Sequence, residues 1–210
     1  SRKSKKKIYI NDINNLPNFV KKKVKKDLKI ILKKKKNFSN LNFQKIPNIM
    51  GVLNLTPDSF SDGGRFNTGK KGLKHALEMF NSGANIIDIG GESTRPGSKA
   101  VANKTEWKRI EKIIKLISKK IPISLDTRKS EVMKKGIKEG IKIINDVSGL
   151  NYDLETINVL KKYKTPFIIH HSQGTPENMQ NKPYYKNELL DIYDFFVKKI
   201  KLLRSIGIRH

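Results

Sequence analysis

Polar side chains that could do chemistry gather in five short strings of this sequence. The first, Asn54-Leu-Thr-Pro-Asp-Ser-Phe-Ser-Asp-Gly-Gly64, brings one amide, two carboxylates and three hydroxyls together with a proline and two glycines. Oxygen ligands of this kind suit Mg²⁺ better than softer metals. The same residue types also form ordinary turns for backbone reasons, so the string alone fits a magnesium site and a plain turn equally well.

The second string, Gly90-Gly-Glu-Ser-Thr-Arg-Pro-Gly97, offers backbone N–H groups, two hydroxyls and the guanidinium of Arg95. This combination favours diphosphate binding, because the forked donors of arginine match the geometry of phosphate oxygens. A glycine turn with a solvated arginine is the structural alternative.

Two further strings place Asp126 and Asn145 directly after apolar runs. A carboxylate that accepts from N–H groups, beside an amide that both donates and accepts, suits a planar, nitrogen-rich heterocycle. The alternative is helix N-capping, and Thr127, Asp146 and Ser148 could serve only that purpose. The last string contains His170 and His171. Adjacent residues of a strand point to opposite faces, so we expect one ring to face the site and the other to pack away from it.

The elements that must position these strings are short apolar runs, each followed by an amphipathic segment. The runs predict buried strands over Ile49–Leu53, Ile86–Ile89, Ile121–Leu125, Ile141–Ile144 and Pro166–His170. Helical stripes are formed by Leu73, Ala76, Leu77 and Phe80; Trp107, Ile110, Ile113, Ile114 and Ile117; Val132, Met133 and Ile137; Leu154, Ile157 and Leu160; and Leu189, Tyr193, Phe196, Val197 and Ile200. Strands without alternation, each followed by a helix, predict an α/β fold with parallel strands joined by right-handed crossovers.

The polar strings follow five different strands at the same end, which favours a (β/α)8 TIM-type barrel over an open doubly wound sheet. A complete barrel takes about 250 residues, so the five βα units predicted here are about three short of one. We therefore expect a partial sequence, truncated after the fifth βα unit.

The basic charge is concentrated in residues 1–45, which hold 16 basic and two acidic residues of a chain whose formal net charge is +26. We interpret residues 1–45 as a Lys-rich N-terminal extension packed on a barrel domain that spans residues 46–210. Val20, Val24, Leu28, Ile31 and Leu32 recur at helical spacing and predict an amphipathic helix within it. Lysine and asparagine are abundant throughout, so compositional drift explains the charge more simply than nucleic-acid binding does.

Composition excludes several classes of protein. The absence of cysteine rules out a disulfide scaffold and cysteine zinc sites. No run approaches the roughly 18 apolar residues of a membrane span, and the basic N-terminus is not followed by the apolar segment of a signal peptide. These features predict a cytoplasmic globular protein.

Read in order, the strings resemble the dihydropteroate synthase family of the folate pathway. The matching segments are Met50–Gly64, Gly83–Gly97, Ile123–Thr127, Ile144–Asp146 and Gln173–Pro176. The resemblance implies a (β/α)8 barrel enzyme, a transferase that condenses p-aminobenzoate with 6-hydroxymethyl-7,8-dihydropterin diphosphate to give 7,8-dihydropteroate and diphosphate.

The resemblance also implies roles for individual residues. Asn54 would contact Mg²⁺, Thr94 and Arg95 would hold the diphosphate, and Asp126 and Asn145 would bind the pterin. The p-aminobenzoate pocket would be formed by Phe60, Asp62 and Pro96. Asp62, Arg95 and Asp126 would act directly in the reaction, and the full-length enzyme would be a homodimer.

The family also has a sixth-strand Asp-Pro-Gly motif and later lysine, arginine and histidine residues that this sequence lacks. We therefore expect the 210-residue piece alone to be inactive. Two alternatives remain: a pterin-binding methyltransferase of the same barrel superfamily, and a basic, non-enzymatic nucleic-acid-binding module.

Overall fold

The computed structural model describes residues 9–33, 47–56, 69–180 and 182–208. Backbone contacts divide the chain into two compact units, the first made of residues 1–38 and 42–46 and the second of residues 39–41 and 47–210. In the first unit a 3₁₀ helix, Ile10–Asn15, precedes helix α1, Asn18–Ile31. The predicted amphipathic helix is thus confirmed, and it begins directly after Pro17. The packing of this extension on the barrel domain stays a prediction.

The second unit contains a parallel sheet of five strands. They are β1 (Met50–Asn54), β2 (Ile86–Gly90), β3 (Ile123–Asp126), β4 (Ile143–Asp146) and β5 (Phe167–Ile169). The strands are ordered β1-β2-β3-β4-β5, so each pairs with its neighbour in the sequence. This is the order of consecutive barrel units and not that of a doubly wound sheet, whose strand order reverses at a switch point. The predicted strands are confirmed to within two residues at their ends.

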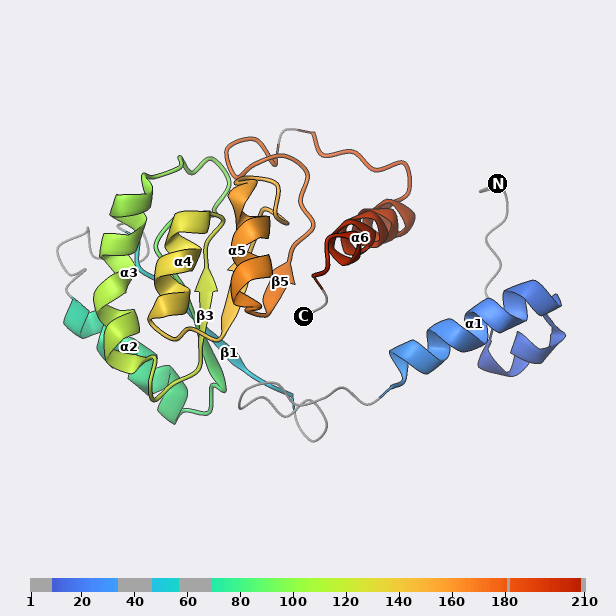
Figure 1. Cartoon of the computed structure of the whole chain (residues 1–210), viewed down its shortest axis with the longest axis horizontal. Coiled ribbons are helices and arrows are strands. Elements are labelled where there is room, and N and C mark those ends of the chain that lie inside the picture. The colour runs from blue at the N-terminus through green and yellow to red at the C-terminus, as the bar shows by residue number, and fades with distance from the viewer. Residues whose placement is uncertain (1–8, 34–46, 57–68, 181, 209–210) are drawn as a thin grey trace. The chain divides into compact units, whose positions relative to one another are not determined.

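A helix follows each strand. The helices are α2 (Gly69–Asn81), α3 (Asn103–Ile117), α4 (Ser130–Lys138), α5 (Glu155–Tyr163) and α6 (Glu188–Ser205). Figure 1 shows α2, α3, α4 and α5 in a row along one face of the sheet. Right-handed crossovers between sequential parallel strands place these four helices on that same face.

The core lies between this row of helices and the sheet. Strand residues such as Leu53, Ile89 and Leu125 pack there against the stripe of α3 that includes Ile110 and Ile114, and all five are at most 1% exposed. The three middle strands are also largely buried on their second face, as the unbroken apolar runs predicted, whereas Val52 of β1 and Ile168 of β5 are exposed there. The helices of the described part include none that is both long and apolar enough to cross a bilayer.

Two predicted stripes differ from the structure. Leu154 is 77% exposed, because it occupies the N-cap position and α5 begins only at Glu155. On α6, Leu189 and Tyr193 are 82% and 58% exposed, and the buried apolar residue is Leu203 instead. An apolar pattern locates one side of a helix, but it does not determine what packs against that side.

Candidate active site

The register of the sheet brings three predicted site residues into one row. Asn54 pairs with Gly90, Gly90 with Asp126, and Asp126 with Asn145. Leu53 and Leu125 face the helices, so by alternation Asn54 and Asp126 lie on the opposite face. We call this face, with Asn54, Asp88, Ser124, Asp126, Asn145 and His170, the inner face. It is where the sequence predicted a site for a heterocycle.

Asp126 is the most strongly perturbed carboxyl group of this face. Burial raises its pKa well above the usual value, and the negative charges of Asp88, Glu106 and other nearby carboxylates add to the effect. Its Oδ1 is buried and has no hydrogen-bond partner among the described residues. A buried acceptor without a partner is costly, so this atom is suited to a ligand that brings an N–H donor.

Asp88 also belongs to this face, although the sequence analysis assigned it no role. Its Oδ2 accepts from Asn145 Nδ2 at 3.0 Å, and its Oδ1 is buried without a hydrogen-bond partner among the described residues. Burial raises the pKa of Asp88, while the nearby Ser124 hydroxyl and the bond from Asn145 oppose that rise. A signal was present in the sequence. Asp88 precedes Gly90 by two positions, as Ser124 precedes Asp126, and this spacing of two puts each pair on a single face.

Beneath the loop that follows β2 lies a buried ion network of Glu92, Glu106, Arg128 and Lys129. Lys129 Nζ donates to Glu92 Oε2 at 2.5 Å and to Glu106 Oε2 at 2.7 Å, and Arg128 Nε donates to Glu92 Oε1 at 2.7 Å. Burial opposes ionisation of Glu92, but the hydrogen bonds from Lys129, Val101 N and Arg128 hold its pKa below the usual value. For Glu106, burial outweighs the bonds to Lys129 and raises the pKa. The network anchors the loop, and no sequence pattern we considered predicted it.

The loop itself carries Thr94, Arg95 and Pro96. Gly97 N donates to Pro176 O at 2.8 Å, which ties this loop to the one that follows β5. Arg95 and Pro96 are exposed. The structure thus keeps the three residues on one loop at the carboxyl end of the sheet.

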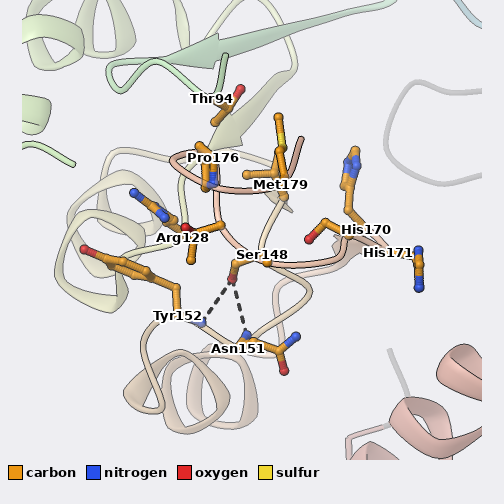
Figure 2. Close-up of a pocket in the computed structure, with 13 residues that line it drawn as sticks. Thr94, Arg128, Ser148, Asn151, Tyr152, His170, His171, Pro176 and Met179 are labelled. Atoms are coloured by element: carbon orange, nitrogen blue, oxygen red, sulfur yellow. Dashed lines mark hydrogen bonds between the residues drawn. The ribbon is translucent and has the colours of Figure 1, made fainter. Parts of the chain in front are cut away.

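A cavity of about 370 Å³ opens between the loops that follow β2, β3, β4 and β5. Figure 2 shows Thr94 and Pro176 on one side of it and Arg128 with Tyr152 on another. The Arg128 guanidinium lies 3.9 Å from the centre of the Tyr152 ring. Ser148 Oγ accepts from the backbone N–H groups of Asn151 and Tyr152. These bonds hold the part of the loop after β4 that lines the cavity.

The two adjacent histidines diverge, and Figure 2 shows their rings pointing in different directions. Both still line the cavity, so the prediction that one of them packs away from the site is wrong. His170 Nε2 lies 2.9 Å from Asn145 Oδ1 on the inner face. The His171 ring packs edge-on against Phe195 of α6, with ring centres 4.7 Å apart.

Local structural roles account for Thr127, Asp146 and Ser148. Asp146 Oδ1 accepts from the backbone N and the hydroxyl of Ser148 at 2.8 and 2.7 Å, and its Oδ2 accepts from Leu150 N. Thr127 Oγ1 accepts from Lys129 N at 3.3 Å. These bonds hold the loops that follow β3 and β4. The predicted N-capping is wrong, because the N-cap residues of α4 and α5 are Lys129 and Leu154 and neither helix has a side-chain cap.

Phe60 and Asp62 lie outside the described residues. Within the described ranges, no group of three or more His, Cys, Asp or Glu side chains is arranged to hold a metal ion. Asn54 offers one amide oxygen at the carboxyl end of β1, beside Asp126. Such a donor fits Mg²⁺, which keeps several waters and often takes only one or two protein ligands together with substrate phosphates.

Comparison with known proteins agrees with this geometry. The family model described as pterin binding enzyme matches residues 50–210. A dihydropteroate synthase of Synechocystis is 41% identical over 76% of this chain and 56% of its own length. The Yersinia pestis dihydropteroate synthase, solved with a sulfonamide drug complex, is 39% identical and has a TM-score of 0.73 over 78% of this chain and 60% of that one.

A Clostridium difficile dihydropteroate synthase, solved in the presence of pteroic acid, is 40% identical with a TM-score of 0.72 over 80% of this chain and 63% of that one. The chain spans 56–58% of the length of three curated dihydropteroate synthases to which it is similar. Since the family model covers more than half of the chain, this protein belongs to the pterin-binding enzyme family.

Proposed function

We propose that the protein carrying this chain is a dihydropteroate synthase, which joins p-aminobenzoate to 6-hydroxymethyl-7,8-dihydropterin diphosphate and releases diphosphate. One observation in this family member carries the proposal. Asp126 Oδ1 is buried on the inner face without a hydrogen-bond partner among the described residues, and Asp126 pairs with Asn145 in the register of the sheet. The relatives compared above bear the name of this enzyme, which supports the same assignment.

Recognition of the pterin rests on Asp126 and Asn145. The pterin ring offers an amino group and a ring N–H along one edge, and the Asp126 carboxylate accepts from them. These donors favour the ionised carboxylate, so binding lowers the raised pKa of Asp126. Asn145 still has one N–H and one oxygen lone pair available beyond its bonds to Asp88 and His170, which suits a ring edge that alternates donors and acceptors.

Departure of the diphosphate is the role we propose for Thr94, Arg95 and Asn54. The bond between the pterin methylene carbon and the diphosphate oxygen breaks, and negative charge collects on the leaving group. The Thr94 hydroxyl and the Arg95 guanidinium donate hydrogen bonds to that charge. Asn54 would hold Mg²⁺, which supplies further neutralisation of the diphosphate when bound.

The amine nitrogen of p-aminobenzoate then forms the new bond to the methylene carbon and loses one proton. We propose Phe60, Asp62 and Pro96 for the p-aminobenzoate pocket, on the strength of the family resemblance. A cytoplasmic location and a homodimer belong to the same proposal and have the same support.

The test uses the natural protein that contains residues 1–210. We expect calorimetry to show binding of 6-hydroxymethyl-7,8-dihydropterin, and a coupled assay to show Mg²⁺-dependent release of diphosphate only when p-aminobenzoate is present. Diphosphate release that does not depend on p-aminobenzoate would contradict the assignment. So would methyl transfer from a methylated tetrahydrofolate, the reaction of the alternative class.

A further inference from the structure

The side chain of Asn145 lies between those of Asp88 and His170. Neither Asp88 nor His170 has been given a contact with the pterin above. Its Nδ2 donates to Asp88 Oδ2 at 3.0 Å, and its Oδ1 lies 2.9 Å from His170 Nε2. The three residues come from β2, from β4, which lies two strands further along the sheet, and from the position directly after β5. They form one continuous polar chain across the inner face.

This chain permits a single orientation of the Asn145 amide. If the amide turned by 180°, its oxygen would face the Asp88 carboxylate, which accepts but does not donate, and that hydrogen bond would be lost. The neutral His170 ring can donate or accept at Nε2 according to its tautomer, so it adopts the tautomer that donates to Asn145 Oδ1. Asp88 thus sets the orientation of the amide, and His170 holds it there with a second hydrogen bond.

We propose that Asp88 and His170 are positioning residues for pterin binding, which fix the Asn145 amide so that it presents one defined donor and one defined acceptor to the ring. The inference rests on the proposed function, because it assigns the pterin to the inner face. Asp88 acts from β2, where it is buried on the inner face at 5% exposure. His170 acts from the exposed end of β5, and its Nε2 must carry the proton that Asn145 Oδ1 accepts.

Asp126 takes no part in this polar chain. Asp88 and Asp126 lie on adjacent strands, and the negative charge of Asp88 is a cause of the raised Asp126 pKa. Asp88 directs its Oδ2 to Asn145, and its Oδ1, like Asp126 Oδ1, is buried without a hydrogen-bond partner among the described residues. Asp88 is thus joined to Asn145, whereas Asp126 stays available to a ligand.

The first experiment compares His170→Gln with His170→Leu in the natural protein. The glutamine keeps an N–H donor within reach of Asn145, and the leucine does not. For 6-hydroxymethyl-7,8-dihydropterin we expect the Kd of His170→Leu to rise about tenfold, the range of one lost hydrogen bond, and that of His170→Gln to stay within about threefold. His75→Leu is the control, because His75 lies on α2, at the helix-covered face.

Asp88 provides an independent pair of variants. Asp88→Asn keeps an acceptor for Asn145 Nδ2, whereas Asp88→Leu fills a similar volume without one. We expect Asp88→Leu to bind the pterin about tenfold more weakly and Asp88→Asn to stay within about threefold of the original protein. The KM for p-aminobenzoate should be unchanged in all four variants, because a positioning role at the pterin does not extend to the second substrate.

A spectroscopic signature completes the test. Nitrogen-15 spectra of the neutral His170 imidazole should show the tautomer protonated at Nε2, and this preference should disappear in Asn145→Leu. Equal pterin affinity in His170→Leu and the original protein, or an Nδ1-protonated ring, would overturn the inference. Equal losses in His170→Gln and His170→Leu would overturn it too, because they would indicate that the ring itself contacts the ligand. Failure of the original protein to bind any pterin would instead contradict the proposed function.

Discussion

Asn54 and Asp126 approach each other across the backbone of Gly90. A Cβ atom added at Gly90 would lie 3.3 Å from Asn54 Oδ1 and 3.3 Å from Asp126 Oδ2. Since Gly90 stands between them in the pairing register, the absence of a side chain there leaves the gap that these two polar groups border. The lack of a side chain at Gly90 thus allows Asn54, the proposed Mg²⁺ ligand, and Asp126, the proposed pterin ligand, to contact the same substrate molecule.

The substitution Gly90→Ala tests this relationship. Contacts of 3.3 Å force both side chains to move by a few tenths of an ångström, but they do not exclude the methyl group. We expect binding of the pterin diphosphate to weaken about tenfold, because a misplaced contact group costs roughly one hydrogen bond. Calorimetry with the pterin diphosphate in the presence of Mg²⁺ is the measurement.

Gly51→Ala is the matched control on the opposite face of the sheet. There the added methyl group would meet Met79 Sδ at 2.9 Å and Ile87 Cδ1 at 3.0 Å, both in the core under the helices. This variant should melt at a lower temperature and bind the ligand as the original protein does. Unchanged ligand binding in Gly90→Ala would show that the gap is not part of the site.

The strands and the residues at their carboxyl ends were predictable because both depend on local patterns. Five unbroken apolar runs, each followed by a helical stripe, specify buried parallel strands. A polar residue where such a run ends, such as Asp126 or Asn145, therefore reaches the edge where the loops gather. The divergence of His170 and His171 follows in the same way from the alternation of a strand.

The ion network and Asp88 were not predictable by that reasoning. Lys129 reads as one more lysine in a chain with 45 basic residues, and only the tertiary fold shows that it is 2% exposed between two carboxylates. Asp88 lies inside an apolar run, where burial of a charge is unfavourable unless a partner is present. Its partner, Asn145, comes from a strand two positions further along the sheet, and the sequence does not display that pairing.

Arg95→Ala separates the diphosphate from the pterin. The guanidinium is exposed on the loop after β2, and we propose that it donates charge-assisted hydrogen bonds to the leaving group. The Kd of the pterin diphosphate should rise by tenfold or more, in line with about 1.5–3 kcal/mol for bonds to charged groups. The Kd of the pterin alcohol should stay within about twofold.

Lys99→Ala is the control for the change in net charge, since Lys99 is also exposed and lies four residues further along. If both ligands lose affinity equally in Arg95→Ala, the arginine does not bind the diphosphate. If Lys99→Ala has the same effect as Arg95→Ala, the contribution is general electrostatic attraction and not a specific contact.

Lys129→Met tests the buried ion network. The substitution leaves Glu92 and Glu106 close together in the interior without their shared cation, so their ionised forms become unfavourable. We expect the free energy of unfolding at neutral pH to fall by about 3–5 kcal/mol, measured by urea denaturation, because breaking a buried pair leaves an uncompensated charge. Lys104→Met, an exposed position on α3, should change it by less than about 0.5 kcal/mol.

The pH dependence of the Lys129→Met deficit has a definite sign. In the original protein the pKa of Glu92 is lowered, so its stabilising contribution is present above the usual glutamate pKa of 4.5 and is lost as the pH falls through the lowered value. In the variant the two carboxyl groups take up protons more readily, and their protonated forms are tolerated in the interior. The deficit should therefore shrink as the pH is lowered toward 4.5, and a deficit that grows on acidification would contradict this account.

Asp126→Asn should have opposite effects on stability and on binding. The pKa of Asp126 is raised, so the native state holds the proton more tightly than the unfolded chain does. The native protein is then favoured at low pH, and it loses stability as the pH rises from the usual value of 3.8 through the raised pKa. Asparagine of the same shape does not ionise, so we expect the ligand-free variant to be about 1 kcal/mol more stable than the original at neutral pH, as replacement of a strained site residue commonly is.

Pterin affinity should change in the other direction, because an amide offers one acceptor where the carboxylate offers two, and its NH₂ group faces the donors of the ring. A loss of about 1–3 kcal/mol in binding free energy is expected, measured by calorimetry. Asp153→Asn is the matched control, since Asp153 accepts from Ser130 N at 2.8 Å and Glu155 N at 3.0 Å and its pKa is lowered despite partial burial. That variant should be less stable at neutral pH with unchanged pterin affinity. An Asp126→Asn protein that loses stability and keeps its pterin affinity would show that Asp126 supports the fold and does not bind the ligand.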